Sequence, residues 1–110
     1  MEITVKTEQN VKVFAITGDI DGKTAPEVQE KVKAEAPAGG KVLLDMTNVL
    51  YMSSAGLRMM LAVYRHVTGS KGSLVLAGLN EEIKETMDMT GFLSQFTVTD
   101  TVVEGLKTLG

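Results

Sequence analysis

The sequence predicts a single α/β domain with a mixed sheet and helices packed largely on one side of that sheet. Its 110 residues suit one domain, which we take to be 1–110, and can bury roughly two-thirds of the surface that the unfolded chain exposes. Near the start of the chain apolar and polar residues alternate, as they do in half-buried strands. Farther on, an apolar run, an amphipathic stretch and a second apolar run follow one another, which indicates a parallel strand–helix–strand crossover.

Two strands open the chain as a predicted antiparallel hairpin. Residues 3–7 alternate apolar and polar side chains, and residues 11–17 alternate again with apolar groups on both faces. Gln9 and Asn10 suit the turn between them. The second strand is therefore expected to be covered on both sides.

A first helix is predicted to begin at Thr24, after a loop over residues 18–22. Thr24 and Glu27 have the spacing of a capping box, and Pro26 falls in the first turn, where its missing N–H does no harm. The apolar positions on one face are Ala25, Val28, Val32 and Ala36. Pro37 and the glycine pair that follows it end the helix.

Residues 42–46 are predicted to form a central strand, because their apolar run is nearly continuous. A second helix is expected to start at Ser53 or Ser54 and to end at residues 69–72. Its predicted apolar stripe comprises Leu57, Met60, Leu61, Tyr64 and Val67. Residues 73–77 then form a strand parallel to the central one.

The last third of the chain predicts two helices and one short strand. Asn80 is the expected N-cap of a helix that turns Ile83 and Met87 inward. Residues 97–99 suit a short strand, and Asp100 or Thr101 suits the cap of a terminal helix. That helix carries Val102, Val103, Leu106 and Leu109.

Composition excludes several functional classes. The absence of cysteine excludes disulfides, thiol nucleophiles and cysteine-ligated metals, and a single histidine excludes a multi-histidine metal site. The formal net charge of −3 argues against nucleic acid or an anionic membrane as partner. The sequence shows neither a long apolar run nor a basic leader, so we expect a cytoplasmic protein.

Ser53 and Ser54 stand where the central strand leads into the second helix. In open α/β sheets that carboxyl edge is where ligands and partners bind, and a helix N-terminus stabilises a phosphate placed there. The alternative is structural: one serine is only the N-cap, and Gly56 only permits close packing. Spacing alone leaves both interpretations open.

Catalysis by either serine is not expected. A nucleophilic serine needs a base within hydrogen-bonding reach, but His66 follows Ser54 by 12 residues on the same predicted helix. That spacing corresponds to roughly 18 Å along the helix axis. The Gly-x-Ser-x-Gly elbow of hydrolases is also missing.

Three acidic residues have more than one interpretation. Asp19 and Asp21 resemble a fragment of a calcium loop but lack its third ligand and terminal glutamate. They suit either a turn held by Asx hydrogen bonds or a recognition edge beside Ser53 and Ser54. Asp45, at the end of the central strand, could orient the serine segment or bond the turn at Thr47 and Asn48.

Residues 44–58, LDMTNVLYMSSAGLR, resemble the signature of STAS domains (sulphate transporter and anti-sigma factor antagonist). Within that family they are most similar to the stand-alone bacterial anti-sigma factor antagonists. The likeness returns at residues 17–21, 89–93 and 101–110, so it covers essentially the whole chain. It implies a STAS-like domain with a mixed four- to five-stranded sheet and about four helices.

The resemblance also implies a binding function without catalysis or cofactor. In such proteins the unphosphorylated antagonist binds an anti-sigma factor that is also a serine kinase, and a sigma factor is released. Phosphorylation breaks the complex, and a PP2C-type phosphatase restores it. A monomer or weak dimer is expected. The alternative is a STAS interaction module of a transport, lipid-trafficking or stressosome-like assembly.

Matched position by position, the resemblance puts the phospho-acceptor at Ser54, with Ser53 as the alternative. The expected partner-binding residues are Asp19, Asp21, Ser53, Ser54, Ala55, Gly56 and Arg58, with Leu57 as a packing residue. Three positions depart from the common pattern: Ser53 replaces an aspartate, Ala55 a serine or threonine, and Arg58 a glycine. Arg58 stands one turn beyond Ser54, where it can neutralise part of a phosphate.

Overall fold

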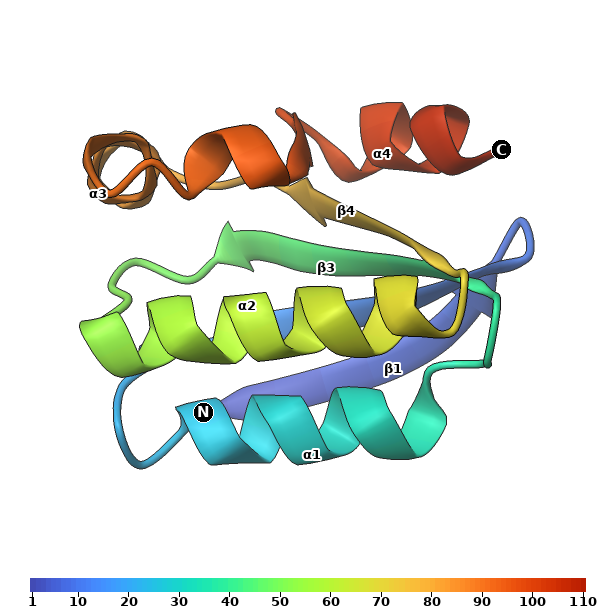
Figure 1. Cartoon of the computed structure of the whole chain (residues 1–110), viewed down its shortest axis with the longest axis horizontal. Helices are drawn as coiled ribbons and strands as arrows, with labels where there is room; N and C mark the ends of the chain where they lie inside the picture. The colour runs from blue at the N-terminus through green and yellow to red at the C-terminus, as the bar shows by residue number, and fades with distance from the viewer.

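The computed structural model describes all residues from 1 to 110 and contains one five-stranded sheet flanked by four helices (Figure 1). The strands are β1 (Glu2–Glu8), β2 (Val11–Thr17), β3 (Lys41–Asn48), β4 (Ser73–Ala77) and β5 (Thr97–Thr99). The helices are α1 (Ala25–Glu35), α2 (Ser54–Gly69), α3 (Glu81–Met89) and α4 (Val102–Leu109), with a short 3-10 turn over Leu93–Gln95. The predicted fold class is confirmed.

The strands lie in the sheet in their sequence order, β1-β2-β3-β4-β5. The opening hairpin is antiparallel, and its turn residues Gln9 and Asn10 take φ values of 52° and 65°. All later neighbours are parallel, so each returns through a helix, which gives the predicted mixed sheet. The carboxyl ends of β2, β3 and β4 consequently meet at one edge of the molecule.

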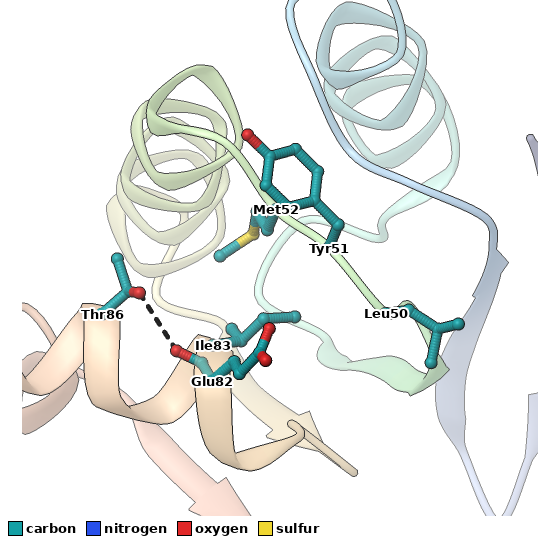
Figure 2. A pocket seen from close by; sticks show the side chains of 6 residues that line it. All are labelled: Leu50, Tyr51, Met52, Glu82, Ile83 and Thr86. Atoms are coloured by element: carbon teal, nitrogen blue, oxygen red, sulfur yellow. Dashed lines mark hydrogen bonds between the residues drawn. The ribbon is translucent and has the colours of Figure 1, made fainter.

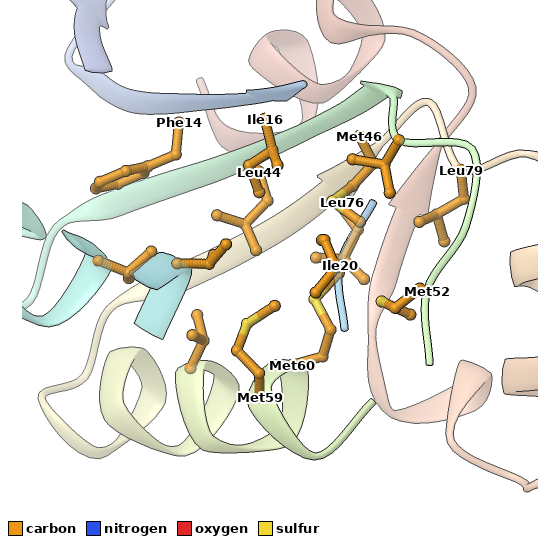
Figure 3. Close-up of a cluster of buried hydrophobic side chains, with 14 of the residues drawn as sticks. Phe14, Ile16, Ile20, Leu44, Met46, Met52, Met59, Met60, Leu76 and Leu79 are labelled. Atoms are coloured by element: carbon orange, nitrogen blue, oxygen red, sulfur yellow. The ribbon is translucent and has the colours of Figure 1, made fainter. Parts of the chain in front are cut away.

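Two apolar cores lie on opposite faces of the sheet. The larger contains 21 buried residues between the sheet and the helices α1, α2 and α3, with Leu44 and Met60 between Phe14 at one end and Leu79 at the other (Figure 3). The smaller contains seven buried residues between the sheet and α4, including Leu106 and Leu109 of α4 itself. The helices thus lie largely on one face, as predicted, while α4 covers the other. None of the helices combines the length and the apolarity that a membrane span requires.

The predicted capping box of α1 is wrong. Thr24 stands before the helix but already has helical φ and ψ, and its side chain makes no cap bond. The Thr24 hydroxyl donates instead to the Asp19 carbonyl (2.8 Å) and accepts from the Asp21 N–H (2.9 Å). The Thr24 backbone N–H, which the Glu27 carboxylate would have to accept from in a capping box, donates to Asp21 Oδ1 at 3.1 Å.

The buried stripe of α2 is rotated from the predicted one. Leu57, Met60 and Val67 are buried as expected, but Leu61 and Tyr64 are only half-buried. Met59 and Val63 are buried in their place. The reason is that α2 packs against α1 as well as against the sheet, which widens its apolar arc.

In α4 the structure fixes the cap residue and shows that one predicted apolar position is exposed. Thr101 is its cap and accepts a hydrogen bond from the Glu104 N–H at 3.2 Å, whereas Asp100 pairs with Lys84. Val103 is 63% exposed, because a helix that packs on one face of a sheet buries only the positions that recur every three to four residues.

Candidate functional site

The serine loop, residues 49–53, lies beside the aspartate loop, residues 18–24, at the carboxyl edge of the sheet. Ile20 and Met52 form an isolated parallel bridge between the two loops. The Ile20 N–H donates to the Tyr51 carbonyl at 3.0 Å, and the Ser53 N–H donates to the Ile20 carbonyl at 2.9 Å. The two loops therefore lie side by side, as the interpretation of a shared edge requires.

Ser53 and Ser54 have different environments. Ser54 is the first residue of α2 and is exposed to solvent. Ser53 occupies the N-cap position with extended backbone, but its side chain makes no capping hydrogen bond. The Ser53 hydroxyl oxygen is buried and has no hydrogen-bond partner. The simple N-cap interpretation is thus right about the place of Ser53 and wrong about its side chain.

The start of α2 is packed closely against both loops. A Cβ atom at Gly56 would lie 2.2 Å from Met52 Cγ and 3.1 Å from Ile20 Cγ2, so only glycine fits without rearrangement. Leu57 is buried, Ala55 is half-buried against the larger core, and Arg58 is exposed without an ion pair. Gly56 and Leu57 therefore hold the site in place, while Ser54 and Arg58 face solvent.

Asp21 shapes the aspartate loop. Its Oδ1 accepts hydrogen bonds from the backbone N–H groups of Lys23 (2.9 Å) and Thr24 (3.1 Å). These backbone N–H donors, Lys23 first and then Thr24, lower the pKa of the Asp21 carboxyl below its ordinary value. The Asx interpretation is therefore confirmed for Asp21, whereas the Asp19 side chain is exposed and makes no hydrogen bond within the chain.

The two interpretations of Asp45 are also resolved. Its Oδ1 accepts hydrogen bonds from the backbone N–H of Thr47 (3.0 Å) and from the Thr47 hydroxyl (2.6 Å). Asp45 therefore bonds Thr47 and makes no hydrogen bond to the serine loop. The predicted turn at Thr47 and Asn48 is wrong, because both residues are still part of β3. His66 lies in the last turn of α2, at the far end of the helix from Ser54, as its spacing predicted.

Sequence reasoning missed the apolar part of the site. Leu50 is 73% exposed and Tyr51 is 53% exposed, directly before the serines. Together with α3 they form a pocket of about 100 Å³, which we call the side pocket (Figure 2). Its lining residues are Leu50, Tyr51, Met52, Glu82, Ile83 and Thr86. The signal available in the sequence was two large apolar residues in a short loop between a strand and a helix.

Comparison with known proteins agrees with this architecture. The sequence model of the STAS domain matches residues 2–105. The anti-sigma-B factor antagonist of Listeria monocytogenes is 32% identical over 92 residues, which are 83% of this chain and 80% of that protein.

Two solved structures share the fold. An anti-sigma factor antagonist from Mycobacterium paratuberculosis superimposes with a TM-score of 0.87 at 21% identity, covering 98% of this chain and 92% of the other. The Bacillus cell fate determinant SpoIIAA in its phosphorylated form superimposes with a TM-score of 0.75 at 14% identity. The match covers 99% of this chain and 100% of the other. With matched residues from β1 to α4, the chain belongs to the STAS domain family.

Proposed function

We propose that this protein is an anti-sigma factor antagonist that acts in the cytoplasm as one STAS domain, monomeric or weakly dimeric. Its unphosphorylated form binds an anti-sigma factor and so releases a sigma factor. The observation that carries the proposal is Ser54, an exposed serine at the N-terminus of α2 on a surface that also exposes Leu50 and Tyr51. The name of the Listeria relative supports the same function.

The proposal includes phosphorylation of Ser54 by the anti-sigma factor itself, acting as a serine kinase, and reversal by a PP2C-type phosphatase. The neighbouring Ser53 is the poorer acceptor, because its hydroxyl oxygen is buried and a kinase cannot reach it without opening the start of α2. The existence of SpoIIAA in a phosphorylated form supports a switch of this kind within the fold.

The physical effect of a phosphate on Ser54 would fall on binding. A phosphoserine adds about 1.5 to 2 negative charges at neutral pH. In a packed interface that charge must be desolvated, and the exposed Asp19 nearby adds repulsion. In the free protein the phosphate is stabilised by the N–H groups of the first turn of α2 and by the cationic Arg58. The fold would therefore remain while the complex dissociates.

The experiment uses the full chain, a kinase-type anti-sigma factor from the same genome, and ATP. We expect peptide mass spectrometry to place one phosphate on Ser54 and size-exclusion chromatography to show that the complex dissociates. Ser54→Ala should bind without being phosphorylated, and Ser54→Asp should not bind. Ser94→Ala, which changes another exposed serine, is the matched control and should behave as the wild type.

Two results would contradict the proposal. Continued phosphorylation and dissociation of the Ser54→Ala protein would show that the acceptor is wrong. If the wild type captures a transporter component and no anti-sigma factor, the protein is an interaction module outside sigma-factor control.

A further inference from the structure

We infer that the side pocket receives an arginine side chain of the anti-sigma factor. This inference rests on the proposed function, and it names the chemistry by which the partner is recognised. The pocket lies between the serine loop, which leads into Ser54, and the first turns of α3 (Figure 2).

The size of the side pocket fits one side chain. Its volume is about 100 Å³, whereas sites for metabolites and cofactors enclose roughly 300 to 1,000 Å³. Small pockets that accept a single anchoring side chain are typical of the centres of protein–protein interfaces. The occupant is therefore a protein side chain and not a free ligand.

The rim of the side pocket is apolar and held in position. Leu50 and Tyr51 are 73% and 53% exposed, so an occupant with an aliphatic stem would cover them. The Asn80 side-chain amide donates to the Leu50 carbonyl at 3.0 Å while its Oδ1 caps α3 at Ile83. The same asparagine thus fixes the loop and the helix that form the two walls.

The charge of the side pocket selects a cation. Glu82 is the only charged residue in its lining, and no cation of this chain pairs with its carboxylate. The nearest lysine in sequence, Lys84, pairs instead with Glu81 and Asp100. A phosphate or a nucleic acid would be repelled by Glu82, and a wholly apolar side chain would desolvate it without compensation.

Arginine satisfies these features better than lysine does. Its three-carbon stem can lie against Leu50 and Tyr51, and its planar guanidinium can stack on the Tyr51 ring. The guanidinium can also donate two parallel hydrogen bonds to the Glu82 carboxylate, which a lysine ammonium cannot do.

The test is a titration of the ¹⁵N-labelled full chain with acetyl-Ala-Arg-Ala-amide, followed by NMR. The control peptide carries citrulline, which keeps the shape of arginine and removes its charge. We expect saturable shifts at the amides of Tyr51, Met52, Glu82 and Ile83, with binding about threefold or more weaker for citrulline, in the range of an exposed charge pair. Glu82→Gln should remove the difference between the two peptides.

The matched control variant is Glu85→Gln, which makes the same change at an exposed position of α3 outside the pocket and should keep the difference. The inference is overturned if no residue of the pocket shifts, if both peptides bind equally, or if Glu82→Gln and Glu85→Gln behave alike. No anti-sigma factor is present in this titration. A negative titration would therefore not contradict the proposed function. A negative result in the phosphorylation and dissociation experiment would likewise not contradict the binding measured in this titration.

Discussion

At the residue scale, two N-cap residues that look equivalent in the sequence differ in their hydrogen bonding. Ser53 and Thr101 each stand at the N-cap position of a helix. The Thr101 hydroxyl oxygen accepts from the Glu104 N–H, whereas the Ser53 hydroxyl oxygen is buried without a partner. A buried hydroxyl without a hydrogen bond costs stability, so Ser53 has an unfavourable place in the free protein.

The first prediction compares the alanine variants of these two caps. Ser53→Ala removes a buried polar group that has no partner, so the free energy of unfolding should stay the same or rise by about 1 kcal/mol. Thr101→Ala removes a formed cap bond and should lower it by about 1 kcal/mol. Urea unfolding followed by circular dichroism measures both values. A loss at Ser53 as large as that at Thr101 would show that Ser53 caps α2 in solution.

The second prediction concerns the pH dependence of the Asp21 turn. Backbone hydrogen bonds lower the pKa of Asp21 in the folded protein, so its carboxylate stabilises the fold above the ordinary aspartate pKa. This contribution is lost as pH falls through the lowered pKa. Asp21→Ala should therefore have a lower melting temperature than the wild type at neutral pH. The difference between the two melting temperatures should become smaller in acid.

Asp19→Ala is the matched control for that experiment, because the Asp19 side chain is exposed and forms no hydrogen bond within the chain. Its melting temperature should follow that of the wild type throughout the pH series. A gap for Asp21→Ala that stays constant down to low pH would show that the turn does not depend on the charged carboxylate.

At the scale of helices and strands, the sequence predicted every element because each carries its own period. The strands over residues 11–17 and 73–77 agree with the structure to the residue. The predicted buried face of α2 was wrong where a second neighbouring element, beyond the sheet, also contacts the helix. Met59 and Val63 are buried because α2 also contacts α1, and no pattern within residues 54–69 records that contact.

The third prediction tests α4 as the cover of the second face of the sheet. Leu106 is 5% exposed in the smaller core, so Leu106→Ala should lower the free energy of unfolding by about 2 to 4 kcal/mol. Val103 is on the same helix but exposed, and Val103→Ala should change it by about 0.5 kcal/mol or less. Chemical denaturation measures both. Equal effects would mean that α4 is not docked as described.

At the scale of the whole molecule, the parallel pairing of β2 with β3 places the aspartate loop beside the serine loop. That proximity could be predicted, because the carboxyl ends of parallel strands meet at one edge. The side pocket could not be predicted, because it depends on how α3 packs after β4. The only signal in the sequence was the pair of large apolar residues Leu50 and Tyr51. The burial of the Ser53 hydroxyl likewise follows from tertiary packing that local sequence does not encode.

The last prediction separates the stability of the whole molecule from its binding. If the proposed switch leaves the fold intact, a negative charge at Ser54 should not destabilise the free protein. Ser54→Asp should raise the free energy of unfolding by about 0.3 to 1 kcal/mol over the neutral control Ser54→Asn, because the charge lies at the positive end of the α2 dipole. Arg58, four residues on, adds to the effect.

In 1 M salt, where the screening length is about 3 Å, this gain in the free energy of unfolding should become smaller. Urea denaturation at two salt concentrations measures it. A destabilised Ser54→Asp protein that has lost helix signal in circular dichroism would contradict the mechanism, since the charge would then act by unfolding α2 and not by blocking the interface.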